Sequence, residues 1–203
     1  MKACILRTCC LLWLGYGLLG CGGGAMGPAE VVVATVTDAG DSIFRSISLN
    51  YRTEEMPERH YLILRKELSL PKMQDFLATE SQVLRAKAVA AGIQSLGPPS
   101  HLFYSWEPEK GWGDAAVALP VAADVELPPY LTINLPATPA LSLEFEGSHA
   151  ALPALHYALG TELSRRSLHA SKPSIEELLV GPADSVPVSN YRTRLIYPYS
   201  PRQ

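Results

Sequence analysis

The feature that most constrains the fold is an order of predicted elements that occurs twice along this chain of 203 residues. In the first unit, apolar periodicity predicts a strand, a helix and two strands, at residues 60–67, 71–91, 101–106 and 115–121. In the second unit, which opens with an extended segment at 131–135, the same order follows at residues 140–146, 150–168, 174–180 and 191–197. Two such halves are expected to fold with pseudo-twofold symmetry, as two helices side by side on one face of a mostly antiparallel sheet.

Both predicted helices carry an apolar stripe with the 3.6-residue period of an α-helix. In the first helix, which Ser69 and Pro71 favour as a start and Gly92 as an end, the stripe has one polar interruption at Glu80 and is made of Met73, Phe76, Leu77, Val83, Leu84 and Ala91. The second helix has Ser148 as its candidate cap, and its predicted buried row is Leu152, Leu155, Leu159 and Leu163. The sequence therefore predicts an α+β fold.

The N-terminus predicts export. All four cysteines lie within the first 21 residues, and the last of them, Cys21, ends an apolar stretch that follows the basic residues Lys2 and Arg7. This layout is typical of a secretory signal, and the stretch is shorter than the roughly 20 apolar residues of a membrane span. The residues Leu18-Leu19-Gly20-Cys21 resemble the lipobox of bacterial lipoproteins, which implies a signal peptide at 1–20 and a lipidated Cys21 on a flexible tether at 21–30.

Two other interpretations of the N-terminus remain open, an ordinary signal cleaved after Ala25 and an uncleaved anchor helix. The lipoprotein interpretation is favoured because the three glycines after Cys21 suit a tether and leave no helix to continue. It predicts a protein anchored to a membrane of the bacterial cell envelope. Gly22 directly after the cysteine resembles lipoproteins that are passed on to the outer membrane, which is therefore favoured over the inner membrane.

Charge and cysteine usage argue against several classes of function. The chain has 17 Lys and Arg residues against 20 Asp and Glu residues, and its densest positive clusters, Arg165-Arg166 and Arg192 with Arg194, are typical of solvated faces. Nucleic acid is therefore not a predicted partner. No cysteine follows Cys21, which removes disulfides and thiolate metal sites from the folded part, and the five histidines show no metal-ligand spacing. We expect neither a metal nor a cofactor.

A series of short motifs runs along residues 45–199. Those of the first half are Gly92-Ile93, Gly97-Pro98-Pro99 followed by Tyr104, and Gly113-Asp114 leading into Ala118-Leu119-Pro120-Val121. Those of the second half are Phe145-Glu146-Gly147-Ser148, the acidic strand 174–178 ending at Gly181-Pro182, and the closing stretch 191–199. In this order and spacing the motifs resemble the GyrI-like (gyrase-inhibitor-like) small-molecule-binding domain.

This resemblance implies a fold that duplicates the SHS2 unit, with modules at about 45–121 and 130–199 and an N-terminal strand extension at 31–44. The family is also the effector-binding half of AraC-type and multidrug-sensing transcription regulators, and it stands alone in some proteins. We find no helix-turn-helix segment in the sequence, and an exported chain could not reach the chromosome. Regulation of transcription is therefore not the expected function.

The resemblance places the ligand in a groove between the two helices and the pocket carboxylate of the family at Glu176. Alternate residues of a strand share a face, so we expect Tyr104 to lie with Trp106, and Glu176 to lie with Leu178 on the equivalent strand. Glu177 is the alternative carboxylate, because a one-residue slip in register would exchange it with Glu176. A carboxylate walled by aromatic side chains can attract a cation, or donate a proton when desolvation raises its pKa.

The predicted ligand-binding residues are Tyr104, Trp106, Trp112, Glu176 and Leu178. The family usually has a tyrosine at the position of Leu178, and the missing hydroxyl weakens the case for catalysis. The aromatic residues have an alternative interpretation as ordinary core or loop residues. The preferred function is an envelope-anchored lipoprotein that binds an apolar or cationic small molecule, with the membrane contacted through the lipid.

Two alternative functions remain open. One is a hydrolase of reactive small molecules that uses Glu176 as its acting carboxyl group, and the other is an interaction protein whose groove is filled by its own side chains. A serine hydrolase built on Ser148 and His149 is not predicted, because adjacent residues at a helix cap point apart and no Gly-x-Ser-x-Gly motif is present. The sequence favours the binder over the enzyme, and an enzyme would be a hydrolase of small molecules.

Overall fold

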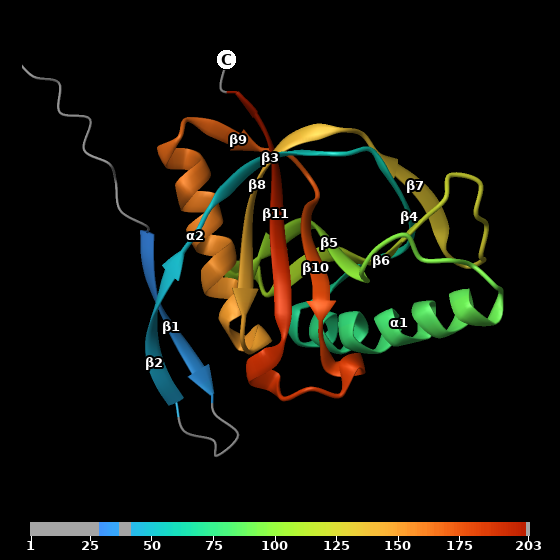
Figure 1. Cartoon of the computed structure of the whole chain (residues 1–203), viewed down its shortest axis with the longest axis horizontal. Coiled ribbons are helices and arrows are strands. Elements are labelled where there is room, and N and C mark those ends of the chain that lie inside the picture. The colour runs from blue at the N-terminus through green and yellow to red at the C-terminus, as the bar shows by residue number, and fades with distance from the viewer. Residues whose placement is uncertain (1–28, 37–41, 202–203) are drawn as a thin grey trace, which may run out of the picture.

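The computed structural model describes residues 29–36 and 42–201 (Figure 1). The predicted signal peptide and Cys21 lie outside these residues. A nine-stranded antiparallel sheet curls around one side of two helices, α1 (Leu70–Ala90) and α2 (Leu152–Arg165). Eight of its strands follow the order β3 (Arg52–Met56), β8 (Thr138–Glu146), β11 (Arg192–Pro201), β10 (Ser174–Val180), β5 (Ser100–Glu107), β6 (Trp112–Val121), β4 (Arg59–Ser69) and β7 (Leu131–Leu135).

Smaller elements lie at the margins of this sheet. The ninth strand, β9 (Leu168–Ala170), pairs with the end of β11. A separate two-stranded sheet consists of β1 (Ala29–Val36) and β2 (Ser42–Leu49), and its strand β1 packs against α2. Single turns of 3-10 helix are η1 (Pro108–Lys110), η2 (His149–Ala151), η3 (Pro182–Asp184) and η4 (Val188–Asn190). None of the described helices is long and apolar enough to cross a membrane.

The duplicated order predicted from the sequence is confirmed. The first half runs β4, α1, β5, β6 and the second half runs β8, α2, β10, β11, and in the sheet these halves are mirrored about the junction of β10 with β5. At that junction the antiparallel pairing sets Glu176 opposite His101 and Ser174 opposite Phe103. The fold is therefore α+β, with a mostly antiparallel sheet and two helices.

Two details differ from the sequence-based expectation. The segment at 131–135 was expected to open the second unit, but it forms β7, which pairs with β4 at the edge of the first half. In turn β3, which precedes β4 in the chain, pairs with β8 of the second half. The edge strand beside each half of the sheet is therefore formed by a segment outside that half's own repeat. The second helix ends at Arg165 rather than near 168, because Ser167 has a positive φ of 57° and the chain then enters β9.

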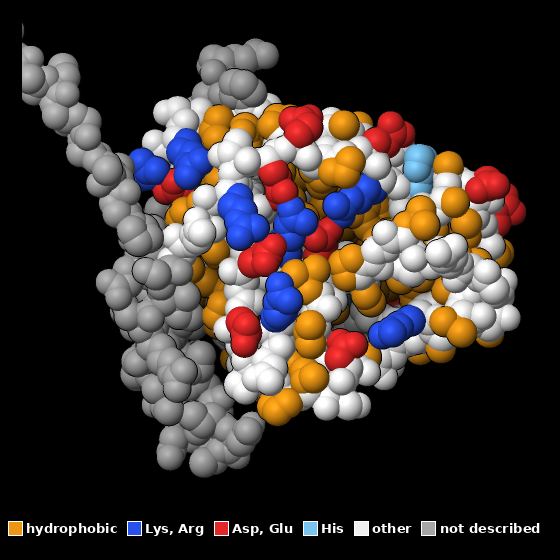
Figure 2. Space-filling model, in the orientation of Figure 1, with side chains coloured by type: hydrophobic (Ala, Val, Ile, Leu, Met, Phe, Trp, Pro, Cys, Tyr) orange, Lys and Arg blue, Asp and Glu red, His pale blue; other side chains and the backbone are white. Residues whose placement is uncertain are grey.

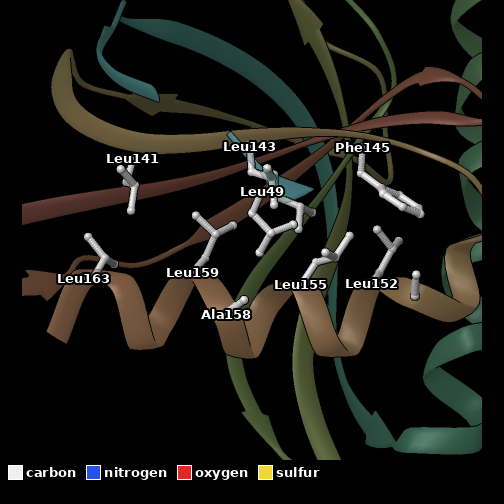
Figure 3. Close-up of a cluster of buried hydrophobic side chains, with 11 residues drawn as sticks. Leu49, Leu141, Leu143, Phe145, Leu152, Leu155, Ala158, Leu159 and Leu163 are labelled. Carbon is white, nitrogen blue, oxygen red and sulfur yellow. The ribbon is translucent and has the colours of Figure 1, made fainter. Parts of the chain in front are cut away.

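Three apolar clusters hold the layers together. The cluster under α2 contains the predicted row of four leucines together with Leu49, Leu141, Leu143, Phe145 and Leu195 (Figure 3). The cluster under α1 includes Met73, Leu77, Leu84 and Ala88 from the helix, and Leu62, Val117 and Leu119 from the sheet. The third cluster, on the opposite face of the sheet, includes Tyr61, Leu102, Ile175 and Ile196. Between the first two clusters the helices diverge over β10 and β5.

The stripe of α1 is narrower than the sequence indicates. Val83 and Ala91 are exposed and Phe76 is half-buried, while Ala88 joins the buried row. Residues of α1 beside this buried row, among them Ser81, line the space between the helices.

Candidate functional site

A cavity of about 1440 Å³ lies between α1 and α2, with β5 and β10 as its floor. This volume exceeds the roughly 300–1,000 Å³ of most small-molecule sites. Apolar side chains form most of its wall, and they include Met73, Leu77, Ala88, Phe103, Leu119, Leu152 and Leu178. The space is therefore large and apolar enough to bury an aromatic ligand.

Glu176 is the acidic residue at the floor of the cavity, and 5% of its surface is exposed. Glu176 is on the side of β10 that faces the helices, and its carboxylate lies close to two imidazoles. His101 on β5 places Nδ1 3.1 Å from Oε2, and His156 on α2 places Nε2 2.7 Å from Oε1. Both carboxylate oxygens therefore have a hydrogen-bond partner, as a buried charge requires.

Hydroxyl groups extend this arrangement on both sides. Ser81 Oγ on α1 lies 3.1 Å from His101 Nε2, and Tyr197 Oη on β11 lies 2.7 Å from His156 Nδ1. With Glu176 ionised, each imidazole donates one N–H to the carboxylate and accepts a hydroxyl proton at its other nitrogen. The result is one hydrogen-bonded chain, Ser81–His101–Glu176–His156–Tyr197, which connects the two helices through the floor of the cavity.

The environment shifts the pKa values of two members of this chain, Glu176 and Tyr197. Burial alone raises the pKa of Glu176, but the hydrogen bonds that His101 and His156 donate to the carboxylate, together with the positive charge that either imidazole carries when protonated, outweigh it and lower the pKa to about 2. Burial raises the pKa of Tyr197 to about 12, since the hydrogen bond with Ser174, which opposes this shift, is weaker and the charge of Glu176 adds to it. The carboxylate is therefore ionised and the phenol is protonated.

Aromatic side chains lead from the carboxylate to the cavity mouth. The rings of Phe103 and His156 meet edge to face at 5.6 Å, and those of Phe103 and Trp106 at 5.7 Å. Trp106 is 40% exposed, and Tyr157, which is 80% exposed, lines the same cavity from α2. Aromatic rings therefore line the exposed part of the cavity together with charged side chains, while the floor carries the buried carboxylate.

Of the five predicted ligand-binding residues, the structure brings Trp106, Glu176 and Leu178 to the cavity wall. Trp112, half-buried at the start of β6 and paired with Glu107 and Ser69, is not among the lining residues. Whether these side chains bind a ligand stays a prediction.

The expected alignment of Tyr104 with Trp106 is wrong. The pairing of β5 with β6 shifts register between Phe103 and Ser105, so a bulge breaks the alternation of the strand. Tyr104 packs with the cluster on the opposite face of the sheet, where the Arg65 guanidinium lies 3.7 Å from its ring centroid. Phe103 takes the position beside the carboxylate that the sequence analysis gave to Tyr104.

Glu177, the alternative carboxylate, lies on the other face of the sheet. Its carboxylate is buried in ion pairs with Arg59 of β4 and Arg194 of β11, and Arg194 also pairs with Glu54 of β3. Side chains of both signs are interspersed over the central strands in Figure 2. The alternation of β10 thus sends Glu176 into the cavity and Glu177 into a structural charge network.

The sequence analysis missed the other members of the hydrogen-bonded chain, namely Ser81, His101, His156 and Tyr197. A signal for His101 existed, because antiparallel pairing of the first residues of the two central strands sets His101 opposite Glu176. Within the described part of the chain, no group of three His, Cys, Asp or Glu side chains is arranged to hold a metal ion.

Comparison with solved structures identifies the same fold in a protein solved in complex with DNA and in a protein solved with tetraphenylphosphonium. The EcmrR C-terminal domain has a TM-score of 0.65 and 14% identity, and the match covers 77% of this chain and 100% of that domain. EcmrR in its DNA complex has a TM-score of 0.64 and 14% identity, over 76% of this chain and 58% of that one. This chain therefore spans little more than half of EcmrR.

A third structure, SAV2435 bound to tetraphenylphosphonium, has a TM-score of 0.55 and 15% identity, with 74% of this chain and 94% of that chain covered. Identities this low show a shared fold and nothing further. No curated protein matches the chain by sequence. The family model described as the GyrI-like small molecule binding domain matches residues 49–200. Since that match spans most of the sequence, the chain belongs to the family of GyrI-like small molecule binding domains.

Proposed function

We propose that the protein binds an apolar or cationic small molecule between α1 and α2, with Glu176 as the negative charge that selects cations. The observation that carries this proposal is an ionised carboxylate at the floor of a large cavity with apolar walls. The cavity volume favours a ligand site over a groove filled by the protein's own side chains. The tetraphenylphosphonium in SAV2435, a protein of the same fold, is a ligand of this chemistry.

The distribution of charge in the cavity supports the preference for cations. The other charged lining residues, Arg85, Lys172 and Asp184, are exposed, so their fields are screened by solvent. Glu176 lies in a less polar environment, where the attraction between its charge and a cation is screened less. An aromatic cation can in addition stack against Phe103 and Trp106 while its charge faces the carboxylate.

The test compares tetraphenylphosphonium with neutral triphenylmethanol by calorimetric titration and thermal shift, since a ligand that binds only the folded state raises its stability. We expect Glu176→Gln to weaken cation binding about tenfold or more, equivalent to about 1.4 kcal/mol, and to leave the neutral compound nearly unaffected. Glu109→Gln, a change of the same charge at an exposed residue of η1 outside the cavity wall, is the matched control. Equal weakening of both ligands would remove the electrostatic role of Glu176.

We further propose that the protein is a lipoprotein of the bacterial cell envelope. The support is the lipobox-like sequence ending at Cys21 and the glycine tether behind it. Cys21→Ser should abolish labelling with palmitate and leave an unprocessed precursor, whereas Cys4→Ser should be labelled like the wild type. A Cys21→Ser protein that is cleaved and released normally would refute the anchor. Membrane fractionation should recover the labelled protein with the outer membrane.

A further inference from the structure

We propose that Ser81, His101 and Glu176 form a nucleophile, base and carboxylate relay that hydrolyses esters of apolar or aromatic acids inside the cavity. The inference rests on the proposed ligand site, because the ester must enter the same space. It goes beyond binding, since it assigns a reaction to Glu176 and to two residues, Ser81 and His101, that binding alone does not need.

The geometry is that of an activated serine. Ser81 Oγ lies 3.1 Å from His101 Nε2, and His101 Nδ1 lies 3.1 Å from Glu176 Oε2. Both distances fall within the roughly 2.6–3.2 Å expected between a nucleophile, its base and the group that orients the base. The hydroxyl and the carboxylate approach opposite nitrogens of one imidazole, which is the arrangement that fixes its tautomer for accepting a proton from serine.

The three side chains are held by separate elements of the fold. Ser81 is on α1, and His101 and Glu176 face each other across the pairing of β5 with β10. His156 binds the second carboxylate oxygen and so prevents Glu176 from turning away from His101. Ser81 is half-buried and lines the cavity, so its hydroxyl is accessible to a ligand carbonyl.

The reaction needs only the ester and water. Ser81 Oγ attacks the carbonyl carbon as its proton moves to His101 Nε2, and the tetrahedral intermediate collapses when the alkoxide leaves with that proton. Water then attacks the acyl group on Ser81 and gives its proton to His101. The acid is released, and the proton returns to Ser81 Oγ. Glu176 stays ionised and stabilises the imidazolium that forms in each half of the cycle.

The experiment measures hydrolysis of 4-nitrophenyl butyrate and labelling by a fluorophosphonate probe, using the full chain. We expect saturable turnover and a probe adduct on Ser81. Ser81→Ala and His101→Gln should each lower kcat/KM about 100-fold. Ser164→Ala, at an exposed serine of α2 whose hydroxyl donates to the Gly160 carbonyl, should keep full activity.

Tetraphenylphosphonium binding by the same variants separates the two proposals. If Ser81→Ala binds the cation like the wild type and loses turnover and adduct, the relay is supported. If the wild type binds the cation but hydrolyses the ester no faster than Ser81→Ala and forms no adduct, the relay is refuted and the binding proposal stands. If the wild type shows neither binding nor turnover, both proposals fail.

Discussion

Glu176→Gln tests the charge at the floor of the cavity through the pH dependence of stability. In the folded protein the pKa of Glu176 is about 2, against 4.5 for an unperturbed glutamate. Because folding lowers this pKa, it favours the ionised form. The resulting stability is fully present above a pH of about 4.5 and is lost as the pH falls toward 2.

The gap between these two pKa values corresponds to about 3 kcal/mol at roughly 1.4 kcal/mol per unit, and about 2 kcal/mol of it is lost by pH 3. Glutamine cannot ionise and makes no such contribution. The difference in unfolding free energy between wild type and Glu176→Gln should therefore shrink by about 2 kcal/mol between pH 6 and pH 3. Urea denaturation at several pH values in this range measures it.

Another carboxylate, that of Glu162, titrates over the same pH range, so its contribution to stability must be controlled for. The hydrogen bonds of Arg165 and Arg166 outweigh burial and lower the pKa of Glu162 to about 2. Both proteins in the comparison keep Glu162, so its contribution cancels in the difference. If the stability curves of wild type and Glu176→Gln run parallel from pH 6 to pH 3, the carboxylate is not held ionised by its histidines, and the electrostatic description of the site is wrong.

Two further predictions concern packing and the cavity wall. Leu159→Ala should lower the unfolding free energy by roughly 2–5 kcal/mol because it opens a cavity under α2. Leu96→Ala, at a residue 65% exposed, should change the unfolding free energy by no more than about 0.5 kcal/mol. Denaturant titration compares the two variants, and equal effects would contradict the assigned core. Trp106→Ala should weaken binding of tetraphenylphosphonium, because Trp106 lines the cavity. Tyr104→Phe should leave this binding unchanged, because Tyr104 faces the other side of the sheet. Calorimetric titration tests both variants, and weaker binding by Tyr104→Phe would contradict the position assigned to Tyr104.

The helices and the succession of helices and strands along the chain could be predicted from the sequence because they depend on local periodicity. The leucine row of α2 repeats every three or four residues and is buried as predicted, and the strands of both halves alternate or run apolar over lengths typical of a sheet. The exchange of β3 and β7 between the halves could not be predicted in this way, because edge pairing depends on how far the sheet curls. No pattern within residues 131–135 indicates which neighbour completes the edge.

The site was predictable only in part. The family resemblance predicted Glu176 rather than Glu177 as the inward carboxylate, and the alternation of β10 places it so, since no bulge interrupts the strand before Leu178. Counting alternate positions failed on β5, where the irregularity after Phe103 reverses the faces of the following residues. A bulge is set by the neighbouring strand as much as by its own sequence, so alternation alone misplaced Tyr104 relative to Trp106.

Duplication explains why a carboxylate and an imidazole meet at this point. The order of the strands in the sheet is symmetric about the pairing of β10 with β5, and this pairing sets Glu176 opposite His101. Two glutamates at such facing positions would repel each other in the buried floor, whereas an acid beside an imidazole stabilises the ionised form. On the helices, Ser81 then supports one member of the pair and His156 the other. The two equivalent halves thus produce one asymmetric site, and neither half holds the hydrogen-bonded chain without the other.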